Sequence, residues 1–154
     1  MTDALPAVGD GDPRVLELDE FFSHPPERVW AALTEPALLG QWLMETDFRP
    51  QLGHRFTFRA PPNPRTGFSG EVACEVLEIE PCRRLRIGWD DARSATPLGW
   101  TVTWTLEPEG HGTRLFLEHA GFDPDDAQQQ LARTIMGGGW RSGVLRRLAA
   151  MLAA

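Results

Sequence analysis

Apolar and polar residues alternate in six stretches of the chain, and a period of two is typical of strands that bury one face. The predicted strands span residues 16–22, 54–59, 68–80, 85–89, 100–106 and 115–119. In the stretch 68–80 the apolar phase changes after Val76, because Leu77 and Ile79 follow out of step, and this change predicts a β-bulge. Short turns rich in proline and glycine join later strands, so we expect antiparallel pairing.

Helical periodicity begins directly after the first predicted strand. Pro25 and Pro26 end that strand and favour a helix that starts at Pro26, since a missing N–H costs little in the first helical turn. A second short helix is predicted over 37–42, after the break at Glu35-Pro36.

A long helix is predicted from Asp125 to Ala154. Its apolar residues recur every three to four positions and form a stripe of Trp140, Val144, Leu148 and Met151 or Leu152. The triplet Gly137-Gly138-Gly139 is expected to interrupt this helix, because three glycines cost roughly 3 kcal/mol relative to alanine in a helix interior.

This order of elements predicts an α+β fold. A curved antiparallel sheet of about six strands is expected to wrap around the long C-terminal helix, with two short helices after the first strand. Residues 1–13 show no apolar pattern and are expected to be a flexible N-terminal tail, whereas 14–154 are expected to form a single domain.

Composition narrows the classes of partner. A net charge of −7 argues against nucleic acid and against an anionic membrane surface. The N-terminal residues do not resemble a signal peptide and no apolar stretch approaches about 20 residues, so we expect a cytoplasmic protein. Cys74 and Cys82 are expected to be reduced thiols, and the histidine spacing fits no metal site, so neither metal nor cofactor is predicted.

Short segments across the chain occur in an order and spacing that are specific in combination. They include Pro25-Pro26-Glu27-Arg28-Val29-Trp30, Gln41-Trp42, Gly70-Glu71-Val72, Glu78-Ile79-Glu80-Pro81, Val102-Thr103-Trp104 and Gly139-Trp140. Over roughly residues 14–152 the chain resembles homologues of the heat shock protein 90 ATPase activator, a family of the START-like (SRPBCC) helix-grip superfamily. The resemblance implies a long C-terminal helix across a concave sheet. It also implies an apolar cavity of the kind that binds lipids, hormones or polyketide-like molecules.

The aromatic side chains fit two interpretations, a ligand cavity and a packed core. In the first, indole N–H groups would orient a ligand within apolar walls. The candidate ligand-binding residues are Trp42, Phe56, Phe58, Phe68, Trp89, Trp100, Trp104, His119, Phe122, Met136 and Trp140.

His119 and Glu20 are the candidate polar groups of this cavity, because both share the inward parity of their strands. The alternatives are a structural, hydrogen-bonded histidine and a solvated glutamate at a strand end. The glycine triplet has two interpretations as well, a gate beside the cavity and a frayed junction between helices.

Three functions remain open at this stage. The first is a protein that binds a small hydrophobic ligand, with a stress response as its candidate context, and no catalytic residue is assigned to it. The second is a cyclase or hydrolase that uses the same cavity, with His119 or Glu20 as acid or base. The third is a regulator that contacts a chaperone, and a homodimer is a further candidate partner.

Overall fold

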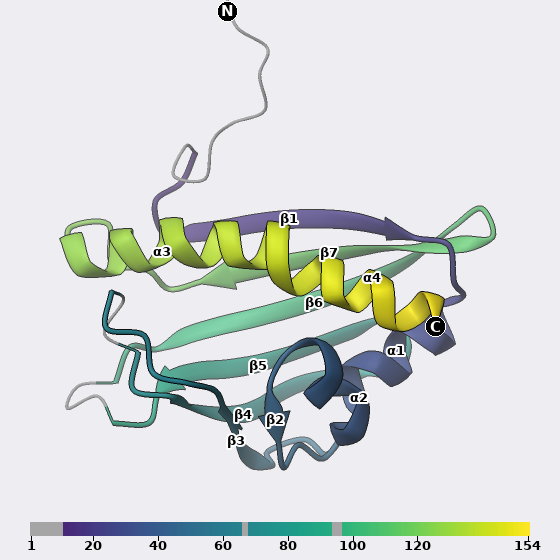
Figure 1. The fold of residues 1–154 in the computed structure, drawn as a ribbon, viewed down its shortest axis with the longest axis horizontal. Coiled ribbons are helices and arrows are strands. Elements are labelled where there is room, and N and C mark those ends of the chain that lie inside the picture. The colour runs from purple at the N-terminus through teal and green to yellow at the C-terminus, as the bar shows by residue number, and fades with distance from the viewer. Residues whose placement is uncertain (1–10, 66–67, 94–96) are drawn as a thin grey trace, which may run out of the picture.

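The computed structural model describes residues 11–65, 68–93 and 97–154 (Figure 1). Its strands form one antiparallel sheet in the order β1-β7-β6-β5-β4-β3-β2. The strands are β1 (Val15–Phe22), β2 (Glu45–Thr46), β3 (Arg55–Arg59), β4 (Glu71–Glu80), β5 (Arg84–Asp91), β6 (Trp100–Glu109) and β7 (Gly112–Ala120). The short strand β2 brings the sheet to seven strands, where the sequence predicted about six.

The bulge predicted in β4 is present, but the side chain of Leu77 is more exposed than the sequence pattern predicted. The register between β4 and β5 shifts between Val76 and Glu78. Leu77 is the extra residue, and its side chain is 43% exposed instead of sharing the buried face with Ile79. Phe68 was predicted within this strand but lies before it, where it forms an isolated bridge with Asn63.

Two short helices follow β1, as predicted. Helix α1 (Pro26–Thr34) begins after Pro25, whose extended backbone precedes the first helical turn, and α2 (Pro36–Trp42) follows directly. The Trp42 indole N–H donates to the backbone oxygen of Ala32 at 2.8 Å, which fixes α2 against α1. Both helices contact the end of the chain (Figure 1).

The C-terminal helix is continuous over 27 residues, and the predicted interruption at the glycine triplet is wrong. Helix α3 (Ala127–Gly139) runs through the triplet, a π turn η1 (Trp140–Val144) follows, and α4 (Leu145–Ala153) completes the helix. Gly139 has helical dihedral angles of −62° and −46°. Packing against the sheet therefore overrides the low helix propensity of glycine.

The π turn changes which side chains of this helix reach the core. Trp140 is buried, and the next fully buried apolar residue is Leu145, five positions later. Val144, which the predicted stripe included, is only partly buried. A π turn inserts one residue relative to an α-helix, so it moves Leu145 into line with Leu148 and Leu152.

Hydrogen bonds from long side chains fasten the helix at both ends. The buried Arg133 guanidinium donates to the backbone oxygens of Val15 at 2.8 Å and Asp12 at 3.0 Å. Gln130 donates to the Pro13 oxygen, and Arg147 in α4 donates to the Trp42 oxygen. The helix thus crosses one face of the sheet, with its N-terminal part held at β1 and its C-terminal part held at α2. This arrangement confirms the predicted α+β helix-grip fold.

The predicted flexible tail coincides for the most part with residues 1–10, which lie outside the described residues.

Replacing Gly138 with alanine is predicted to stabilise the protein by about 1 kcal/mol, because Gly138 lies in a continuous helix. An added Cβ would meet no atom within 4 Å outside the local helix backbone. Urea unfolding of both proteins would measure the difference. Gly121→Ala is the control with the opposite sign, since Gly121 has φ +103° and its Cβ would lie 2.9 Å from the Gly99 oxygen. A loss of stability in Gly138→Ala would contradict the continuous helix.

Candidate functional site

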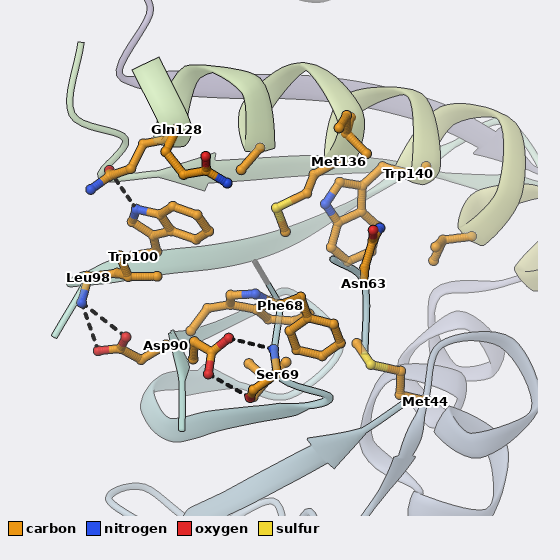
Figure 2. Close-up of a pocket in the computed structure, with 18 of the residues that line it drawn as sticks. Met44, Asn63, Phe68, Ser69, Asp90, Leu98, Trp100, Gln128, Met136 and Trp140 are labelled. Atoms are coloured by element: carbon orange, nitrogen blue, oxygen red, sulfur yellow. Dashed lines mark hydrogen bonds between the residues drawn. The ribbon is translucent and has the colours of Figure 1, made fainter. Parts of the chain in front are cut away.

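A pocket of about 560 Å³ lies between α3 and the sheet, beside the segment that joins β3 to β4. Figure 2 shows Gln128, Met136 and Trp140 on the helix facing Phe68, Ser69 and Trp100. Most lining residues are apolar: Leu43, Met44, Phe68, Val72, Trp89, Leu98, Trp100, Ala132, Ile135, Met136, Gly139, Trp140 and Val144. The polar lining residues are Asn63, Ser69, Asp90, Asp91, Arg93, Gln128 and Gln129.

Three of the four aromatic residues that line this pocket are tryptophans, Trp89, Trp100 and Trp140. Trp89 and Trp100 are paired neighbours on β5 and β6, and the ring centroids of Trp89 and Trp140 are 6.0 Å apart. The Trp100 indole N–H donates to the Gln129 side-chain oxygen at 3.2 Å, which ties β6 to α3. Indole faces offer large rigid contact areas for an apolar or aromatic molecule.

The carboxylates that line the pocket are held by hydrogen bonds from the protein. Asp91 accepts from the Ser69 backbone N–H at 2.9 Å and from the Ser69 hydroxyl at 2.6 Å, while Asp90 accepts from the Leu98 N–H at 3.0 Å (Figure 2). Burial raises the pKa of Asp91, but hydrogen bonds from Ser69 and Arg93 outweigh burial and lower that pKa overall. Asp91 is therefore ionised at neutral pH and locks Ser69 to the end of β5.

His119 lies behind the tryptophan wall and does not line the pocket. It is fully buried, and its ring centroid lies 5.6 Å from Trp89, 5.5 Å from Trp100 and 4.9 Å from Phe122. The Trp140 indole N–H donates to His119 Nδ1 at 3.4 Å. Burial lowers the pKa of His119 to about 3, so the imidazole is neutral at physiological pH.

The predicted cavity residues divide between the pocket and the core. Phe68, Trp89, Trp100, Met136 and Trp140 line the pocket. The others are buried away from its lining: Trp42, Phe56, Phe58, Trp104, His119 and Phe122. Glu20 is exposed on the edge strand β1, away from the pocket lining.

Apart from Met136 and Phe68, sequence reasoning missed the lining residues of α3 and those of the loops. Ala132, Ile135 and Gly139 lie three to four residues apart on a face of α3 that is offset from the predicted stripe through Trp140, Val144 and Leu148, so following that stripe did not find them. Asn63, Ser69 and Leu98 come from loops and carry no periodic signal.

No group of three or more His, Cys, Asp or Glu side chains in the described part of the chain has the placement of a metal site. Within residues 11–65, 68–93 and 97–154, no helix combines the length and apolar character needed to cross a membrane.

Comparison with known proteins identifies both sequence and structural relatives. Residues 23–153 match one family model, described as Activator of Hsp90 ATPase homolog 1-like protein. Protein MLL2253 from Mesorhizobium loti is 37% identical, with a TM-score of 0.78 over 91% of this chain and 97% of that chain. A Rhodobacter sphaeroides protein is 29% identical, with a TM-score of 0.73 over 94% of this chain and 95% of that chain.

A third solved structure, CalU16 from Micromonospora echinospora, is 27% identical, with a TM-score of 0.70 over 90% of this chain and 75% of that chain. No functionally curated protein matches the sequence.

Burial of neutral His119 predicts a pH dependence of the free energy of unfolding. The unfolded state takes up a proton near pH 6.5, whereas the folded state resists protonation down to about pH 3. The stabilisation is therefore complete above pH 6.5 and is lost at about 1.4 kcal/mol per pH unit as the pH falls below it.

The measurement is urea unfolding of the wild type and of His119→Phe at several pH values between 7 and 4. The variant lacks this titration, so the difference between the two free energies should change with pH. Parallel curves would contradict a neutral, desolvated His119.

Proposed function

The chain belongs to the Activator of Hsp90 ATPase homolog 1-like family, and on that basis we propose that it binds a small apolar molecule beneath α3. The observation that carries the proposal is the pocket of about 560 Å³ with its three tryptophans. Ligand sites have volumes of about 300–1,000 Å³ and combine apolar walls with few polar groups. Lipid-, hormone- and polyketide-like molecules are the classes that fit such walls.

Binding is favoured over catalysis in the same pocket. His119 is buried behind the wall and Glu20 is exposed on β1, so neither acid–base candidate lines the pocket. Asp91 is ionised and engaged with Ser69 and the backbone of Arg93. A general acid or base must lie within hydrogen-bond reach of its substrate.

The distribution of exposed apolar side chains gives little support to a chaperone-docking surface. Of the large exposed ones in the described residues, Phe21 in β1 and Phe116 in β7 are diagonal neighbours on paired strands, whereas Leu52, Leu77 and Leu131 come from three other segments. An interaction surface normally gathers such residues into one patch.

Two neighbouring glycines offer a matched test of the proposal. Gly139 lines the pocket and Gly138 does not, while an added Cβ at either would meet no atom within 4 Å outside the local helix backbone. Gly139→Leu is predicted to weaken binding of the neutral fluorescent probe N-phenyl-1-naphthylamine about tenfold, because the new side chain occupies roughly 50 Å² of apolar contact. Gly138→Leu is the control and should bind like the wild type.

Probe fluorescence and quenching of tryptophan emission would give the affinities. Native mass spectrometry of the purified protein would in addition reveal any small molecule that copurifies. An absence of binding by the wild type to apolar and aromatic probes, or equal affinities of the two leucine variants, would contradict the proposal.

A further inference from the structure

The polar groups around the pocket differ in whether they have hydrogen-bond partners. The carboxylates of Asp90 and Asp91 accept from protein N–H and O–H groups, and the Trp100 N–H donates to Gln129. By contrast, His119 Nε2 and Trp104 Nε1 are buried and have no hydrogen-bond partner among the described residues. Buried polar atoms without partners are unfavourable and uncommon, so these two require an explanation.

Both atoms without a partner are donors. An indole nitrogen carries a hydrogen and cannot accept, which fixes the role of Trp104 Nε1. His119 Nδ1 accepts from the Trp140 indole, so in the neutral ring the proton lies on Nε2. A group that satisfied them would therefore have to be a hydrogen-bond acceptor.

The Trp140 indole lies beside both side chains that carry these donors. Its ring centroid lies 6.2 Å from that of Trp104 and 6.4 Å from that of His119, and Trp140 also lines the pocket. Both side chains thus lie next to a residue of the pocket wall.

Trp140 is also placed where a side chain can be displaced. Its hydrogen bond to His119 is long, at 3.4 Å, and it begins the π turn η1. Gly138 and Gly139 precede it, and the space beside them is uncrowded. Single π turns inside α-helices occur frequently at functional sites.

We propose that the ligand carries a carbonyl oxygen that displaces the Trp140 indole and accepts hydrogen bonds from Trp104 Nε1 and from the N–H of the neutral His119 ring. This inference rests on the proposed binding function and specifies the ligand class as an apolar body with a ketone- or ester-type carbonyl at its leading end. The carbonyl supplies the acceptor that the buried donors lack, and the body contacts Trp89 and Trp100 in the pocket.

The test compares two molecules of nearly equal size, 2-acetylnaphthalene and 2-ethylnaphthalene, in titrations of the wild-type protein labelled with ¹⁵N. The ketone should bind about fivefold more tightly than the hydrocarbon, the gain expected from a net hydrogen bond. The ketone, and not the hydrocarbon, should shift the indole N–H signal of Trp104 downfield. It should also change the ring-nitrogen signals of His119 and the Trp140 indole signal.

A pair of variants provides the control. Trp104→Phe should reduce the preference for the ketone about twofold or more. Trp42→Phe should leave it unchanged, because the Trp42 indole already donates to Ala32 and lies outside the pocket lining. The wild-type spectra decide the question even if a variant fails to fold.

Equal affinities with unmoved Trp104 and His119 signals would overturn this inference and leave the binding function intact. An absence of binding by both molecules would overturn the inference together with the proposed function.

Discussion

The structure depends on how one long helix is fixed across a curved sheet. At its C-terminal end, Leu145, Leu148 and Leu152 are buried and α4 contacts α1 and α2. At its N-terminal end, Arg133 and Gln130 donate to backbone oxygens at the start of β1. Because both ends are fastened, α3 can lie over a hollow instead of a filled core. The same fastening that stabilises the fold thus creates the pocket.

The π turn determines what the helix presents at this position. Without the inserted residue, the stripe that begins at Trp140 would continue through Val144 and would turn Leu145 away from the core. With it, Leu145 is buried while Trp140 and Val144 both line the pocket. A local irregularity therefore lets one helix serve the core and the pocket at once, which agrees with the frequent occurrence of π turns at functional sites.

His119 connects the pocket wall to β7, the strand next to the sheet edge. It lies on β7 between Leu16 and Val102, and its ring touches three of the tryptophans that line the pocket. A neutral imidazole there costs less than a charged one in an aromatic environment. The buried position of His119 fits a structural role in the pocket wall better than a role as a general acid or base. This favours binding over catalysis.

The sequence by itself determined the order of elements, the antiparallel sheet, the bulge after Val76 and the long C-terminal helix, because these follow from local periodicity and turn chemistry. It also determined which aromatic residues face inward. Tertiary structure alone decided how deep each lies: Trp100 lines the pocket, whereas Trp104, on the same face of β6, is covered by Trp140. Glu20 shares the parity of Leu18 and Phe22, which are buried on the same strand, yet Glu20 itself is exposed. The depth of each side chain and the continuity of the C-terminal helix depend on contacts between segments that are distant in the sequence. Neither helix propensity nor the period of the apolar residues encodes those contacts.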